Sequence, residues 1–195
     1  MSSSQDEKIQ IVAFSTNDIS QTPIDIINIF LGHQTHQVLK KARQAIAFST
    51  NIKNSSKASK IMICSVLNLT REYTGITDVN CYIVFIDLEN KDSLIKFNNI
   101  IDYAKENCQL TKKIFVLGMI SGNEEDEIKI NKSNITKILD NLKVKYEYNE
   151  INLSKIKEIS DILMDILDYS SKHSIHEDED EIDKEDGQAR SCILF

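Results

Sequence analysis

The residues of this 195-residue chain that could do chemistry lie mainly in polar loops between apolar segments. The first such loop, residues 15–21, follows an apolar run at the place where a phosphate-binding fold needs glycines, a lysine and a Ser or Thr for magnesium. It contains no glycine and no lysine, and the carboxylate of Asp18 would repel phosphates. We therefore expect an ordinary connecting loop here, without a phosphate site.

Two further loops lack the residues that hold a guanine nucleotide. Residues 119–122 read Met-Ile-Ser-Gly after an apolar strand, where a small GTPase has Asn-Lys-x-Asp to bind the base. Residues 70–75 read Thr-Arg-Glu-Tyr-Thr-Gly, with no Asp-x-x-Gly to hold a magnesium-bound water. Because all three nucleotide-binding elements are missing together, we expect no cofactor, no metal and no catalytic residue, and we predict that the chain is not an enzyme.

Other polar clusters give no stronger alternative. His33 and His36 have no cysteine or acidic partner nearby, and residues 124–127 are an acidic run without the ligand spacing of a calcium loop. We interpret both as solvent-exposed features. The basic residues that could contact nucleic acid are Lys40, Lys41, Arg43, Lys53, Lys57 and Lys60. They lack interleaved aromatic residues, so we expect nucleic acid to be contacted only indirectly.

The four cysteines, Cys64, Cys81, Cys108 and Cys192, show no spacing typical of a metal site. Cys64 and Cys81 lie inside apolar runs, where a free thiol packs as a small hydrophobic group. The sequence shows no secretory signal and no apolar run long enough to span a membrane. We expect a reducing, intracellular compartment and no disulfides.

The segment 171–195 carries most of the negative charge. It has eight acidic and three basic residues, so it supplies −5 of the net −7, and we predict a disordered acidic tail. Its last four residues, Cys-Ile-Leu-Phe, fit a prenylation motif of the geranylgeranyl type, which makes Cys192 a candidate lipidation site. Because an anionic leaflet would repel this tail, we expect the lipid to hold a membrane weakly or to dock into a protein partner.

Apolar strand-like runs alternate with helical patterns through the rest of the chain. Strands are predicted at residues 8–14, 60–67, 80–88, 113–118 and 144–148, helices at 24–47, 91–109, 132–142 and 154–169, and loops at 48–59 and 68–77. The alternation predicts βαβ units and a mostly parallel sheet between helices. We therefore expect an α/β, three-layer, small-GTPase-like (P-loop NTPase-type) fold over residues 7–170, after a disordered N-terminus at 1–6.

The predicted helix at 24–47 depends on apolar residues spaced three and four apart. These are Ile27, Phe30, Leu31, Val38, Leu39, Ala42 and Ile46. Pro23 suits the first turn of this helix, and Gly32 with the following His-Gln-Thr-His stretch could interrupt it. At the last helix, Ser154 is a moderate candidate for the N-cap, because the glutamate of a capping box is missing.

Five segments between Lys60 and Lys172 resemble the centromere protein M family. They are NCYIVFIDL (80–88), ENKDSLIKFNNIIDYAKENC (89–108), KKIFVLGMISG (112–122), KSNITKILDNLKVKYEYNEINL (132–153) and SKIKEISDILMDILDY (154–169). That family has a small-GTPase-like fold without nucleotide-binding motifs, and the three empty positions favour it over ordinary Rab or Ras proteins.

The resemblance implies a non-catalytic scaffold at the kinetochore, in the nucleus. It would bind centromere protein I together with the H and K subunits and contribute to chromosome segregation. The acidic tail and the motif at Cys192 are outside that family's pattern. They indicate an alternative, a prenylated Rab- or Ras-like protein that acts in membrane trafficking on the cytoplasmic face of membranes.

Overall fold

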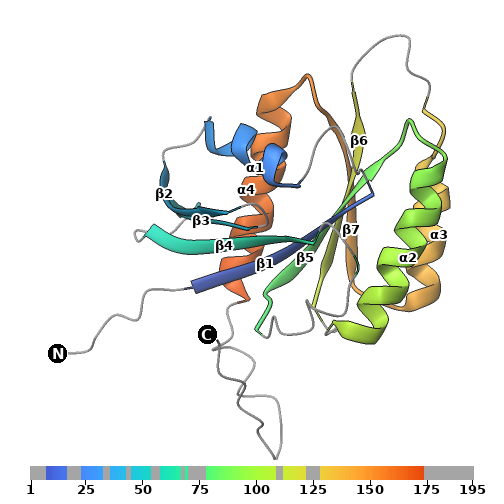
Figure 1. The fold of residues 1–195 in the computed structure, drawn as a ribbon, viewed down its shortest axis with the longest axis horizontal. Coiled ribbons are helices and arrows are strands. Elements are labelled where there is room, and N and C mark those ends of the chain that lie inside the picture. Colours follow the sequence, from blue (N-terminus) through green and yellow to red (C-terminus); the bar gives the residue numbers. More distant parts are fainter. Residues whose placement is uncertain are drawn as a thin grey trace, which may run out of the picture.

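One α/β unit is formed by the residues that the computed structural model describes, which are 8–16, 23–32, 36–42, 45–53, 58–66, 69, 78–108, 112–121 and 128–173. Its strands are β1 (Lys8–Ser15), β2 (His36–Ala42), β3 (Ala45–Asn51), β4 (Ala58–Val66), β5 (Cys81–Asp87), β6 (Ile114–Ile120) and β7 (Tyr146–Asn152). Its helices are α1 (Pro23–Gly32), α2 (Asp92–Asn107), α3 (Lys132–Leu142) and α4 (Ile156–Lys172) (Figure 1).

The sheet is mostly parallel, with an antiparallel side. The strand order is β2-β3-β4-β1-β5-β6-β7. β1 pairs in parallel with β4 and β5, and β6 pairs in parallel with β5 and β7. β3 is antiparallel to both β2 and β4. The prediction of a mostly parallel α/β sheet is therefore confirmed.

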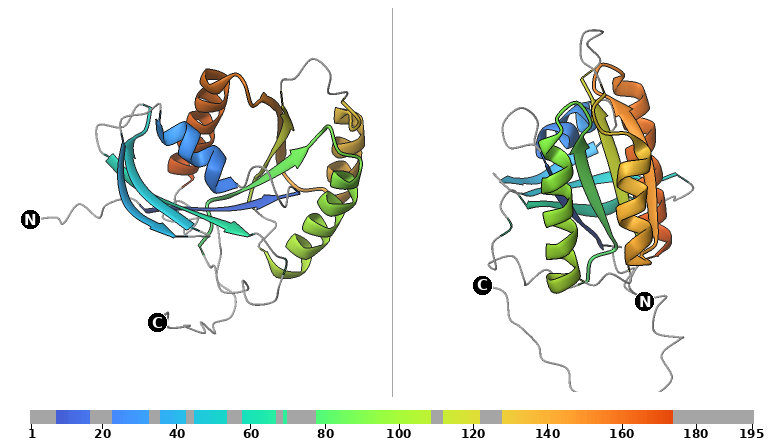
Figure 2. Two further views of the ribbon diagram at one scale, coloured as in Figure 1. Left: turned by 45° about the horizontal axis from the view of Figure 1, so that its top comes forward. Right: turned by 90° about the vertical axis from the view of Figure 1, so that its right-hand side faces the viewer.

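Helices cover both faces of the sheet, which gives three layers. α1 and α4 share one hydrophobic core with the sheet, and α2 and α3 share a second core on the opposite face. Figure 1 shows these helices as two separate pairs, and the left view of Figure 2 shows β2 and β3 curving around α1. Strands covered on both faces need apolar residues throughout, as the fully apolar strand β6 illustrates.

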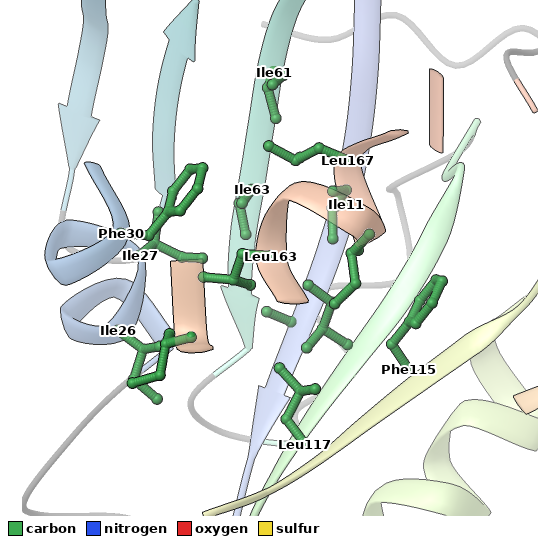
Figure 3. Close-up of a cluster of buried hydrophobic side chains, with 14 of the residues drawn as sticks. Ile11, Ile26, Ile27, Phe30, Ile61, Ile63, Phe115, Leu117, Leu163 and Leu167 are labelled. Atoms are coloured by element: carbon green, nitrogen blue, oxygen red, sulfur yellow. The ribbon is translucent and has the colours of Figure 1, made fainter. Parts of the chain in front are cut away.

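The core beneath α1 and α4 is built from large side chains of distant segments (Figure 3). Ile11 of β1 and Leu163 of α4 are almost completely buried. Phe30 of α1 meets Phe48 of β3 edge to face, with ring centroids 6.3 Å apart. Burying one such side chain contributes about 1.5–3 kcal/mol, so these contacts are sufficient to fix α1 and α4 against the sheet.

The predicted helix over residues 24–47 is wrong beyond Gly32. Pro23 does open α1, but residues 36–42 and 45–51 form the antiparallel strands β2 and β3. The register shifts between Val38 and Lys40, so Leu39 is the extra residue of a β-bulge. This bulge breaks the two-residue alternation of β2, and the apolar residues therefore acquire the spacing of a helix.

The predicted loop over residues 48–59 is also wrong at both of its ends. Residues 48–51 complete β3, where Phe48 has no exposed surface and Thr50 is buried. β4 begins at Ala58, two residues before the predicted strand. Polar composition suggests a loop, but pairing with β4 and burial of Phe48 outweigh that local preference.

The remaining elements lie close to their predicted positions. α3 has the predicted bounds, whereas β7 runs from Tyr146 to Asn152 and so begins and ends later than expected. α4 continues to Lys172, past the predicted domain end at residue 170. Ser154 is not the N-cap of α4, because its hydroxyl donates to Asn152 Oδ1 (2.6 Å) and the cap position belongs to Lys155.

Candidate functional site

The carboxyl ends of β1, β5 and β6 meet at one edge of the sheet, which we call the carboxyl edge. In open parallel sheets ligands bind at this edge. The described residues that follow the three strands are Thr16 after β1, residues 88–90 after β5, and Ser121 after β6. Thr16 and Ser121 belong to two of the three loops in which the sequence predicts that nucleotide-binding groups are missing, whereas the third loop, 70–75, lies outside the described residues.

Thr16 joins the ends of β1 and β5. It is almost fully buried, and its backbone N–H donates to the carbonyl of Phe85 (3.0 Å). Its hydroxyl oxygen accepts a hydrogen bond from the backbone N–H of Asp87 (3.1 Å). Thr16 therefore links β1 to β5 at the point where the loop begins. Its hydroxyl oxygen already accepts a hydrogen bond within the fold.

Glu89 joins the ends of β5 and β6 in the same way. Its carboxylate accepts hydrogen bonds from the backbone N–H of Ser121 (2.9 Å) and from the Ser121 hydroxyl (3.0 Å). The Asp87 carboxylate accepts a hydrogen bond from the backbone N–H of Glu89 (3.0 Å). Two half-buried acidic residues, two positions apart in the chain, therefore lie at this edge. Negative charge of this kind disfavours a phosphate ligand.

The first residue of the segment that would contact a guanine base is packed inward. Met119 is buried in the core beneath α1 and α4. At Gly118, an added Cβ would lie 2.8 Å from both Leu88 Cδ1 and the Tyr148 hydroxyl oxygen, so any larger residue would force these two side chains to shift. The side chains at this strand end thus serve packing between β5, β6 and β7.

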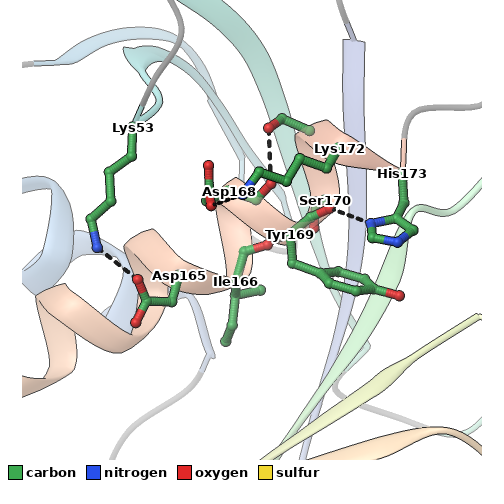
Figure 4. A network of polar contacts seen from close by, with 9 residues as sticks. Lys53, Asp165, Ile166, Asp168, Tyr169, Ser170, Lys172 and His173 are labelled. Atoms are coloured by element: carbon green, nitrogen blue, oxygen red, sulfur yellow. Dashed lines mark hydrogen bonds and ion pairs between the residues drawn. The ribbon is translucent and has the colours of Figure 1, made fainter.

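Several residues that the sequence analysis singled out lie outside the described residues. They are Asp18, His33, Arg43, Lys57, the segments 70–75 and 124–127, Gly122 and Cys192. His36 is described and begins β2, so it does not lie on the first helix. Lys53 forms an exposed ion pair with Asp165 of α4 (2.6 Å), which Figure 4 shows away from the helix end at Lys172.

A second polar cluster lies at the opposite, amino edge of the sheet, and the sequence analysis missed it. Asn80 is buried, and its side-chain oxygen accepts from the backbone N–H of Gln10 (2.8 Å). Its amide nitrogen donates to the carbonyls of Ser170 (3.4 Å) and His173 (3.2 Å). One asparagine therefore ties β1 to the end of α4. An asparagine at the head of an otherwise apolar strand is the only sequence signal for it.

Cys81 belongs to the same cluster. Its sulfur lies 3.1 Å from the hydroxyl oxygen of Ser170, which also donates to the carbonyl of Ile166. Burial raises the pKa of the Cys81 thiol to about 12. A thiol of this kind stays protonated at neutral pH, so it is a packing group and a poor nucleophile. Cys64 and Cys108 are also free thiols.

The ammonium group of Lys113 makes cation–π contacts with two aromatic rings near this edge. Its ammonium lies 4.5 Å from the ring centroid of Phe115 and 4.6 Å from that of Tyr169, and it pairs with Glu147 (2.7 Å). The hydrogen bond from Lys113 lowers the pKa of the Glu147 carboxyl below its usual range. His173 stacks on Tyr169 at 4.0 Å (Figure 4), so the aromatic cluster also orders the end of α4.

The described part of the chain offers neither a metal-binding cluster nor a helix suited to crossing a membrane. It contains no group of three or more His, Cys, Asp or Glu side chains that could hold a metal ion. Within the same residues, no helix combines the length and apolar character needed to cross a bilayer.

Comparison with known proteins adds no relative. No family model matches the chain, and no curated protein matches it.

Proposed function

We propose that this protein is a non-catalytic scaffold with a small-GTPase-like fold, which resembles the centromere protein M family and acts by binding other proteins. The observation that carries the proposal is the closed carboxyl edge, where Glu89 engages both donors of Ser121 and Thr16 is bonded to β5. A nucleotide phosphate placed at this edge would meet the carboxylates of Asp87 and Glu89, which would repel it.

The order of elements supports the finer fold assignment. A strand and a helix are followed by antiparallel strands, and strand–helix units then run to the last helix. This agrees with a small-GTPase layout in which the loop after β1 contains neither glycine nor lysine. A rigid sheet that holds no nucleotide remains useful as a platform for partner proteins.

The partners follow from the family resemblance. We propose that the chain binds centromere protein I together with the H and K subunits. It would act at kinetochores in the nucleus, and it would contact nucleic acid only through these partners. No small-molecule substrate enters this role, and the contribution to chromosome segregation is assembly of the complex.

Purification of the tagged full chain, with identification of the co-purifying proteins and imaging of the chain in dividing cells, tests this role. The proposal predicts centromere proteins in the purified material and foci at centromeres. A strictly endomembrane distribution, abolished by Cys192→Ser, would instead support the prenylated trafficking protein and refute the centromere role. The Cys192→Ser variant serves as the control in both assays, because the scaffold role predicts centromere foci with or without the thiol.

A further inference from the structure

The strand β2 forms one edge of the sheet, at the margin away from α2 and α3 (Figure 1). It pairs with β3, and among the described strands none pairs with the other side of its backbone. In an edge strand of this kind, every second residue directs its N–H and C=O groups outward. The outer side of β2 can therefore form hydrogen bonds with an added strand.

Two neighbouring apolar side chains are exposed on β2. Val38 is 45% exposed and Leu39 is 47% exposed, whereas Phe48 of the adjacent strand β3 has no exposed surface. Val38 lies directly opposite Phe48, so both side chains are on the face of the sheet that α1 and α4 cover. A chain that pairs with β2 would cover Val38 and Leu39, and would thus bury apolar surface as well as backbone groups.

Two lysines give this edge a positive charge. Lys40 and Lys41 are exposed, and neither forms an ion pair or a hydrogen bond with another of the described residues. Lys41 lies opposite Ile46, which is buried beneath α1 and α4, and Lys40 lies opposite Ala47. Because neighbouring residues of a strand point to opposite faces, each face of the sheet carries one of the two lysines at this edge.

The lysines determine which kind of strand can be added. Pairing of two β2 edges from separate copies is disfavoured, because it would bring the lysines of both copies close together. A strand with carboxylates is favoured, since it finds a lysine on either face. The opposite edge of the sheet has the opposite charge: β7 carries exposed Glu147 and Glu150 and would repel such a strand.

We propose that β2 is a docking site for an extended segment of a partner protein, and that this segment carries both acidic and apolar side chains. The segment adds a strand to the sheet, and its backbone pairs with the outer side of β2. Its apolar side chains cover Val38 and Leu39, and its carboxylates lie beside Lys40 and Lys41. The inference rests on the scaffold role and deepens it, because it names one surface that binds a partner.

Binding of synthetic peptides to the purified full chain tests the proposal. The probe is a fluorescent seven-residue peptide, as long as β2, in which Glu and Val alternate. One control peptide has Lys in place of every Glu. The other keeps every side chain of the probe but is methylated on two neighbouring backbone nitrogens, one of which must face β2. Fluorescence anisotropy at about 50 mM NaCl should show binding of the unmethylated acidic peptide alone.

Hydrogen exchange and a matched pair of variants locate the peptide. Exchange should slow at the β2 amides that face away from β3. Lys40→Glu with Lys41→Glu should weaken binding of the probe by about tenfold or more. Lys137→Glu with Lys157→Glu makes the same change in net charge at exposed lysines of α3 and α4, and should leave binding unchanged. Melting curves of both variants verify that they are folded.

Four results would overturn the proposal. They are no binding of the probe up to about 1 mM, equal binding of the methylated peptide, slowed exchange at β7 instead of β2, and self-association through β2 without peptide. The peptide test uses the purified chain alone, so its failure is distinct from a failure of the scaffold role. If centromere proteins co-purify equally with wild type and with the Lys40→Glu, Lys41→Glu variant, this docking site is refuted and the scaffold role stands.

Discussion

Glu89 accepts two hydrogen bonds from Ser121, one from the backbone N–H at 2.9 Å and one from the hydroxyl at 3.0 Å. The two residues follow β5 and β6, so this contact joins two strand ends at the carboxyl edge. In a fold of this layout, the same edge would receive a ligand. Among the described residues of this edge, Glu89 and Ser121 bind each other, and this contact supports the proposed scaffold role without nucleotide.

The Glu89–Ser121 contact should contribute measurably to stability. Hydrogen bonds to a charged group contribute about 1.5–3 kcal/mol, so Glu89→Ala should lower the free energy of unfolding by about that amount. Ser121→Ala loses only the hydroxyl donor, so its cost should be about 1 kcal/mol. Urea denaturation measures both. Glu158→Ala is the control, because Glu158 forms an exposed ion pair with Lys155 and should change stability by less than about 1 kcal/mol. Equal effects of Glu89→Ala and Glu158→Ala would contradict the account.

Asn80 should hold the end of α4 against β1. Asn80→Ala leaves the N–H of Gln10 and the carbonyls of Ser170 and His173 without this partner, so we expect a loss of about 2–4 kcal/mol. Hydrogen exchange should accelerate at the Gln10 amide and in the last turn of α4. Asn98→Ala, at an exposed asparagine that bonds only within its own helix, should stay within about 0.5 kcal/mol of wild type. Unchanged protection at Gln10 would refute this role.

Two glycines give opposite predictions. Gly118→Ala forces a Cβ within 2.8 Å of Leu88 and Tyr148, so overpacking should lower stability by about 1–3 kcal/mol. Adding Tyr148→Phe removes one of the two contacts and should recover part of that loss. An added Cβ at Gly32 meets nothing within 4 Å, so Gly32→Ala should be neutral or stabilising by up to about 1 kcal/mol. Thermal melts of the three variants measure these changes in stability. A neutral effect of Gly118→Ala would argue against the close approach of Leu88 and Tyr148 to Gly118.

The Lys113–Glu147 pair should give a pH-dependent contribution. The pKa of the Glu147 carboxyl is lowered in the fold from 4.5, mainly by the hydrogen bond from Lys113. A lowered pKa means that the stabilisation is present above about pH 4.5 and is lost as the pH falls through the folded-state pKa. Glu147 is half-exposed, so the contribution should stay below about 1 kcal/mol.

Melting curves of wild type and Glu147→Gln between about pH 3 and pH 7 measure this term. The two should differ near neutral pH and converge at the acidic end. In a Lys113→Gln background the difference should largely disappear at every pH. A difference that grows on acidification would have the wrong sign for this pair.

Sequence patterns predict the fold best where burial is one-sided or complete. α3 alternates buried Ile135 and Leu139 with exposed residues at helical spacing, and β5 is a continuous apolar run buried on both faces. Both elements are recognisable from local sequence alone.

The failures have a common cause in long-range pairing. β2 and β3 exist because β3 pairs with β4, and the bulge at Leu39 gives β2 a helix-like spacing. Phe48 precedes a polar stretch that is typical of a loop, and only its contact with Phe30 shows that it belongs to the core. The candidate site follows the same rule: the missing nucleotide motifs are visible in sequence, but the Glu89–Ser121 and Asn80–His173 contacts join residues far apart and are not.

Titration calorimetry of the purified full chain with magnesium and GTP, GDP or ATP at about millimolar concentration shows whether the carboxyl edge can hold a nucleotide. A nucleotide-binding small GTPase measured in parallel provides the positive control. A scaffold without a nucleotide site should give no heat beyond dilution, and denaturing the purified protein should release no guanine nucleotide. One-to-one binding of a nucleotide, or its release from the purified protein, would refute the proposed role.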